Sequence, residues 1–175
     1  WESPTGTGVI AAPMTYELNG NQYVAIAAGW GGVSGLSSTY SSTQTTGKVY
    51  TFKLNGKAKL PDFPKPAPKT LVSGVSYKIK DAKDVQYGAK LFLNYCFICH
   101  GMPASNTGGR IPNLGYSHQV VIQNLNAYVL EGALTKRGMP NFKGRLSEED
   151  VEKIKTFIQI TADQTKAAME KAKKD

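Results

Sequence analysis

The chain holds two cysteines, and a histidine follows the second of them. They form the run Cys96-Phe97-Ile98-Cys99-His100, which matches the C-x-x-C-H signature of c-type haem attachment. Two thiols at this spacing, at the end of a helix, reach the two vinyl-derived carbons on one edge of a porphyrin. The adjacent histidine then lies under the iron and supplies a ring nitrogen. The sequence therefore predicts one covalent haem c on Cys96 and Cys99, with His100 as an axial ligand of the iron.

Other uses of this cysteine pair fit less well. A disulfide between Cys96 and Cys99 would close a very tight ring. The redox motif of thioredoxin-like proteins occurs near a βαβ pattern, which this sequence lacks. A zinc site needs a second pair of ligands, and His118 is the one histidine left after His100. Haem attachment is the interpretation that accounts for both cysteines and the histidine together.

The second axial ligand determines what such a haem does. Five other side chains could reach the iron: Met14, Met102, Met139, Met169 and His118. Met139 is preferred because it lies between two predicted helices, far enough from His100 to cross to the opposite face of the haem. A glycine and a proline flank it and hold the loop in one conformation. Met102, in contrast, is tethered to the same face as His100.

His100/Met139 ligation would raise the reduction potential and suit electron transfer. Two alternatives stay open. His118 could be the sixth ligand instead, although it falls at the start of a predicted helix where exposed residues are common. An open sixth position would instead indicate a haem enzyme or a gas-binding domain.

Two further residues are candidates for the haem pocket. The backbone carbonyl of Pro112 could accept a hydrogen bond from the other ring nitrogen of His100 and so orient the imidazole. Arg110 could pair with a haem propionate. The alternatives are a rigid turn at Pro112 and a solvated arginine at position 110.

Composition describes an ordinary globular protein, with 41% hydrophobic and 19% charged residues. No apolar run approaches the roughly 20 residues that a spanning helix needs. The start of the chain, at Trp1, lacks the basic and apolar segments of a signal peptide. The net charge is +8. Since most of the excess falls on lysines spread along the segment 48–80, rather than gathered on one folded face, a nucleic-acid partner is not expected.

The chain divides into three predicted segments. Residues 1–57 favour β structure: two runs flank an Asn-Gly turn at 19–20 and predict a hairpin, and an alternating run over 48–54 predicts a third strand. Such a small sheet cannot bury both faces, which indicates a piece of a larger β architecture. Residues 58–80 are rich in proline and lysine and predict a linker. Residues 81–175 are helical, so the fold class is mainly α.

Three helices are expected in the last segment. The first spans about 81–95, with Gly88 at a close-packing position against the third. The second begins after Ser117 as N-cap and ends near residue 132. The third begins at Ser147, which acids follow, and continues as an exposed extension beyond residue 161.

These motifs resemble a known family. The C-x-x-C-H run, with Pro112-Asn113-Leu114 and Gly138-Met139-Pro140, resembles a class I cytochrome c across nearly all of residues 81–160. The runs 8–16 and 22–32 are similar to the closing blades of the eight-bladed propeller in PQQ-dependent alcohol dehydrogenases. A propeller end, a linker and a C-terminal cytochrome c form the arrangement of the quinohaemoprotein type.

The resemblance implies a periplasmic parent enzyme that oxidises an alcohol at PQQ, with calcium, and passes electrons to the haem. Trp30 falls in the loop that lies near the quinone in that family. Most of the propeller, its calcium ligands, its catalytic aspartate and its vicinal disulfide lie outside this sequence. The chain is therefore predicted to be a C-terminal fragment that transfers electrons but has no catalytic site of its own.

The partners expected from the resemblance are the dehydrogenase domain of the same parent chain and an external acceptor. The acceptor would be a small copper protein, a cytochrome or a quinone-linked system. Unpaired edges of the β segment also predict self-association. An independent periplasmic cytochrome c, whose β segment is an unrelated docking module, is the remaining alternative.

Overall fold

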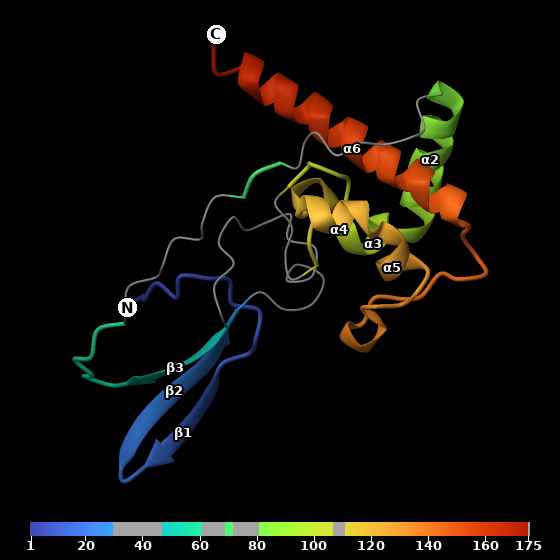
Figure 1. Cartoon of the computed structure of the whole chain (residues 1–175). Helices are drawn as coiled ribbons and strands as arrows, with labels where there is room; N and C mark the ends of the chain where they lie inside the picture. The colour runs from blue at the N-terminus through green and yellow to red at the C-terminus, as the bar shows by residue number, and fades with distance from the viewer. Residues whose placement is uncertain (30–46, 61–68, 72–80, 107–110, 175) are drawn as a thin grey trace. The chain divides into compact units, whose positions relative to one another are not determined.

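The computed structural model describes residues 1–29, 47–60, 69–71, 81–106 and 111–174. The chain separates into two compact units, residues 1–68 and 69–175, each with its own fold (Figure 1). The boundary between them falls inside the segment predicted as a linker.

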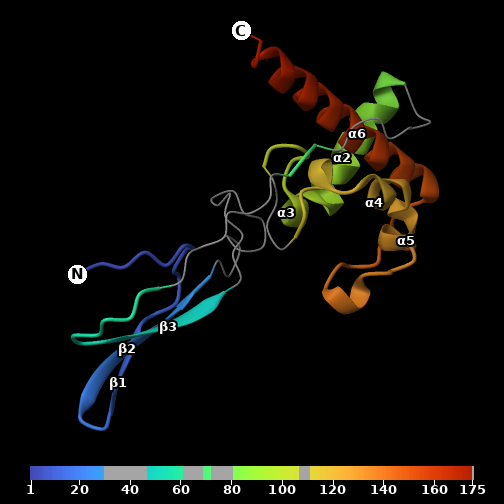
Figure 2. The same ribbon diagram turned by 60° about the vertical axis from the view of Figure 1, so that its left-hand side comes forward.

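The first unit contains a three-stranded antiparallel sheet in the order β1-β2-β3 (Figure 2). Its strands are β1 (Met14–Leu18), β2 (Asn21–Ala28) and β3 (Lys48–Lys53). Asn19 and Gly20 both have positive φ angles, 52° and 69°, as the tight turn of a two-residue hairpin requires. The predicted hairpin and third strand are confirmed.

The two faces of this sheet differ in solvent exposure. On one face the ring of Trp1 lies 5.1 Å from that of Phe52, and the Tyr50 hydroxyl donates to the carbonyl oxygen of Thr5. On the other face, Met14, Leu18 and Val49 are exposed. The described residues thus leave one apolar face of the sheet bare, as expected for a piece of a larger β structure.

The second unit is helical. Its elements in chain order are α2 (Ala82–Tyr95), α3 (Phe97–His100), η1 (Leu114–Tyr116), α4 (Gln119–Gln123), α5 (Leu125–Val129), η2 (Thr135–Arg137) and α6 (Glu148–Lys171). Buried side chains from α2, η1, α4, α5 and α6, and from the loop just before α6, meet in one apolar core: Leu91, Phe92, Leu114, Ile122, Leu125, Val129, Leu146, Val151, Ile154 and Ile158. None of the described helices has the length and hydropathy needed to cross a membrane.

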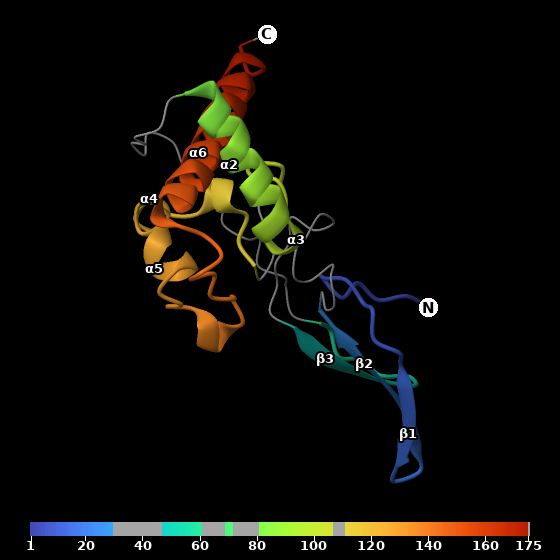
Figure 3. The same cartoon turned by 90° about the vertical axis from the view of Figure 1, so that its right-hand side faces the viewer.

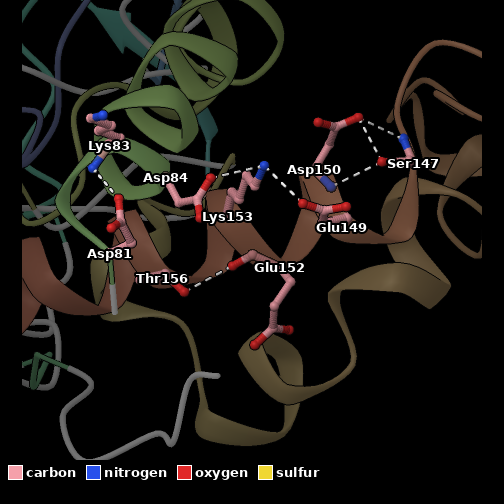
Figure 4. Close-up of polar contacts among 9 residues, drawn as sticks. All are labelled: Asp81, Lys83, Asp84, Ser147, Glu149, Asp150, Glu152, Lys153 and Thr156. Carbon is pink, nitrogen blue, oxygen red and sulfur yellow. Dashed lines mark hydrogen bonds and ion pairs between the residues drawn. The ribbon is translucent and has the colours of Figure 1, made fainter. Parts of the chain in front are cut away.

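Helices α2 and α6 cross at the centre of this unit (Figure 3). Gly88 permits the crossing, because a Cβ at this position would approach the carbonyl oxygen of Lys153 to 2.2 Å. The Lys153 ammonium also pairs with Asp84 of α2 at 3.0 Å and with Glu149 at 2.9 Å (Figure 4). The close packing predicted at Gly88 is confirmed.

Each helix of this crossing pair begins with a side-chain cap. The Asp81 carboxylate accepts from the backbone N–H of Lys83 at the start of α2. At the start of α6, the Ser147 hydroxyl accepts from the Asp150 N–H, and the Asp150 carboxylate accepts from the Ser147 N–H (Figure 4). This reciprocal capping box fixes where the third predicted helix begins.

The second predicted helix differs from the expectation. It is two short helices, α4 and α5, interrupted at Asn124, whose side-chain amide donates to the carbonyl oxygen of Val120. Such local side-chain bonds compete with the helical pattern, and the β-branched run before Asn124 adds little helix propensity. The predicted N-cap is also wrong. His118 caps α4 by accepting from the Val120 N–H, while the Ser117 hydroxyl is buried without a partner in the described structure.

Candidate haem-attachment site

The two cysteines and the histidine lie on a single helical turn that continues α2. Cys96 ends α2 by donating its N–H to Phe92 at 2.9 Å, and it begins α3. The backbone N–H groups of Cys99 and His100 both donate to the carbonyl oxygen of Cys96. Residues three apart on a helical turn share a face. No disulfide joins Cys96 to Cys99.

The environment of Cys96 disfavours thiolate chemistry. Burial, and to a smaller degree a charge on Cys99, raise the pKa of the Cys96 thiol to about 12. A redox-active C-x-x-C motif depends on the opposite, a cysteine whose pKa is lowered to favour the thiolate.

The imidazole of His100 is held by one of its ring nitrogens. Nδ1 lies 2.7 Å from the backbone carbonyl oxygen of Pro112, which can only accept, so Nδ1 carries the proton. Burial lowers the pKa of His100, and the bond to Pro112 offsets part of that effect. The ring is thus neutral at neutral pH, with the lone pair of Nε2 free. The hydrogen bond predicted for Pro112 is present.

Met139 lies on the same core as the attachment turn. Met139, Phe142, Tyr95 and Cys96 are half-buried and pack against the apolar cluster. The rings of Tyr95 and Phe142 meet edge to face with centroids 5.6 Å apart. This contact joins the end of α2 to the loop that follows Met139. Gly138, at φ 93°, turns the chain immediately before the methionine.

The other candidate ligands lie in less suitable places. Met14, Met102 and Met169 are exposed. The Nδ1 of His118 already accepts from a backbone N–H at the start of α4. Trp30 and Arg110 lie outside the described residues.

Asn113 was not predicted as a site residue. Its side chain is fully buried and bonds to the backbone around the attachment turn. The sequence offered one signal, an asparagine directly after the proline whose carbonyl orients His100.

The chemistry of this donor set fits haem c. The site offers two cysteine side chains on one turn, an imidazole whose Nδ1 is held by a backbone carbonyl, and a half-buried thioether. Within the described ranges, no group of three or more His, Cys, Asp or Glu side chains is placed to hold a metal ion directly.

Comparison with known proteins places the helical unit in a class. A family model described as cytochrome c oxidase, cbb3-type, subunit III matches residues 83–158. The chain is 52% identical to the 1-butanol dehydrogenase (cytochrome c) of Thauera butanivorans. It is 49% identical to the quinohemoprotein alcohol dehydrogenase of Comamonas testosteroni. Each alignment covers 93% of this chain and 23% of the relative.

The solved structures agree. The crystal structure of the Comamonas testosteroni enzyme superposes with a TM-score of 0.78 at 48% identity, over 93% of this chain and 23% of that one. The helical unit therefore resembles the cytochrome c part of these enzymes in sequence and in fold. The chain as a whole is homologous to one part of the quinohaemoprotein alcohol dehydrogenases and spans 23% of the length of these relatives.

Proposed function

We propose that this chain transfers single electrons through one haem c, attached by thioether bonds to Cys96 and Cys99. His100 and Met139 are the axial ligands. The observation that carries the proposal is the 2.7 Å contact from His100 Nδ1 to the Pro112 carbonyl, because it leaves Nε2 free as a ligand atom in a fixed orientation. The haem supplies the one-electron couple.

The protein's own residues position the haem and shield it from solvent. Pro112 orients the histidine ring, as groups behind a ligand commonly do. The packing of Met139 and Phe142 on the apolar core restricts the loop that carries the thioether. An apolar surrounding and a histidine/methionine ligand pair both favour electron transfer over the binding of small molecules.

The relatives suggest where the electrons come from and go. We infer that the parent protein is a periplasmic quinohaemoprotein alcohol dehydrogenase, with PQQ and calcium in a propeller domain outside this sequence. Electrons pass from reduced PQQ to this haem and then to a small copper protein, a cytochrome or a quinone-linked acceptor. Residues 1–57 correspond to the end of that propeller.

A spectroelectrochemical titration of the holoprotein tests the electron-transfer function. We expect one reversible transition that transfers one electron, and no binding of carbon monoxide to the reduced protein on mixing. Rapid binding of carbon monoxide, or turnover with peroxide, would instead support a haem with an open sixth position.

The contact between Tyr95 and Phe142 gives a prediction about the methionine loop. Phe142→Ala removes a half-buried ring and should lower the free energy of unfolding by about 2 kcal/mol. It should also let cyanide displace the methionine faster, because the loop loses its anchor on α2. Stopped-flow mixing with cyanide measures the second effect. Leu93→Ala, at an exposed side chain on α2, is the control and should leave the rate unchanged.

Limited proteolysis distinguishes a propeller fragment from an independent docking module. The sheet of residues 14–53 leaves an apolar face exposed, so we expect it to be poorly stable alone. Cleavage within residues 61–68 should yield a lasting haem-bearing C-terminal piece and an N-terminal piece that is degraded. Mass spectrometry of the digest identifies both. Survival of a folded N-terminal piece would favour the independent module.

A further inference from the structure

Asn113 is a polar side chain with no exposed surface, placed directly after Pro112. Its side-chain oxygen accepts from the N–H groups of Ala104, at 2.8 Å, and Gly115, at 3.1 Å. Its amide nitrogen donates to the carbonyl oxygen of Met102, at 2.6 Å, and makes a longer bond of 3.4 Å to that of His100. The amide therefore uses both its donor and its acceptor capacity on backbone groups.

These bonds join the two segments that hold the histidine ring. His100, Met102 and Ala104 belong to the attachment turn and the loop after it. Asn113 belongs to the loop that carries the Pro112 carbonyl. The Asn113 side chain connects these two segments. It therefore fixes the position of the Pro112 carbonyl relative to His100 independently of the hydrogen bond between Pro112 and His100.

The backbone at this junction shows how closely the segments approach. Ala104 has a left-handed conformation, with φ at 63°, which costs an alanine about 1 kcal/mol. Its N–H is the group that Asn113 accepts from. A Cβ on Gly115 would lie 2.5 Å from the Ala104 nitrogen. The bond to Asn113 thus stabilises the strained turn at Ala104, and the absence of a side chain at Gly115 leaves room for it.

We propose that Asn113 is a positioning residue that sets the strength of the bond between Pro112 and His100, and through it the reduction potential of the haem. This inference rests on the proposed axial role of His100. A strong bond at Nδ1 makes Nε2 a better electron donor, which favours the oxidised iron. Loosening the Pro112 carbonyl weakens the bond and favours the reduced iron.

The test compares three variants of the full holoprotein. Asn113→Ala removes all four bonds, and Asn113→Ser keeps a hydroxyl that can make some of them. Thr156→Ala is the matched control, since Thr156 is equally buried and its hydroxyl donates to the Glu152 carbonyl within α6. The readouts are the reduction potential and the free energy of unfolding.

We expect Asn113→Ala to favour the reduced form about tenfold, which is a rise of about 59 mV for one electron. Asn113→Ser should fall between Asn113→Ala and the unmodified chain. Thr156→Ala should lose stability while keeping the potential. An unchanged potential in both Asn113 variants, with lowered stability alone, would make Asn113 a purely structural residue and overturn the proposal.

If the variants do not fold, a measurement on the unmodified protein tests the proposal instead. In the reduced, diamagnetic holoprotein, the Nδ1 proton of His100 should be visible by NMR and exchange slowly with water. Rapid exchange would show that the Pro112 carbonyl does not hold it and would contradict the proposal. Failure of the proposed function itself looks different, because the unmodified chain would then carry no histidine-ligated haem at all.

Discussion

Replacing Met139 with alanine is expected to lower the reduction potential on the order of 100 mV or more, because axial ligands shift haem potentials over several hundred millivolts. The thioether stabilises reduced iron relative to water or an empty position. The near-infrared band of methionine-ligated ferric haem should disappear in the same variant. Redox titration and absorption spectroscopy of the ferric protein measure the two effects.

Two control variants distinguish the loss of an axial ligand from a general loss of stability. Met102→Ala removes an exposed methionine beside the attachment turn and should keep both the potential and the band. His118→Ala should cost about 1 kcal/mol of stability through loss of the α4 cap, again with an unchanged spectrum. A band that survives in Met139→Ala would assign the sixth ligand to another methionine, and a band missing from the unmodified protein would contradict methionine ligation.

The second large effect is expected at the crossing of α2 and α6. Gly88→Ala places a Cβ against the backbone of Lys153, at 2.2 Å from its carbonyl oxygen. The helices must separate, and we expect the free energy of unfolding to fall by about 3 kcal/mol. That is a large part of the total for a domain of this size.

The direction of the change in the free energy of unfolding is informative, because helix propensity alone would predict the opposite effect. In an open helix, glycine to alanine is stabilising by about 0.5–1 kcal/mol. Gln86→Ala, on the exposed side of α2, is the control and should change stability little. Chemical denaturation of the holoprotein measures both. A Gly88→Ala variant as stable as the unmodified chain would mean that the two helices do not meet as closely as described.

Local signals in the sequence predicted much of the fold. Asn19 and Gly20 predicted the hairpin because few residues adopt positive φ. Ser147 and the acids after it predicted the start of α6, since unpaired N–H groups at a helix start select such residues. The stripe on α2 likewise predicted Gly88 as a close contact.

The sequence predicted less well those features that depend on contacts formed only in the folded chain. The break at Asn124 and the capping role of His118 depend on which polar group reaches a free backbone atom, and the pattern alone favoured one helix beginning at Ser117. Asn113 was missed because its importance comes from backbone groups around residues 100–104, brought beside it only by folding. The ligand roles of His100 and Met139 remain predictions.

The most direct test is the mass of the intact holoprotein under denaturing conditions. The chain is produced in a host that attaches haem c, alongside a Cys96→Ala/Cys99→Ala double variant. We predict that the unmodified chain keeps the mass of one haem after unfolding, whereas the double variant shows the mass of the polypeptide alone. Release of the haem from the unmodified chain, with both thiols intact, would contradict covalent attachment at Cys96 and Cys99.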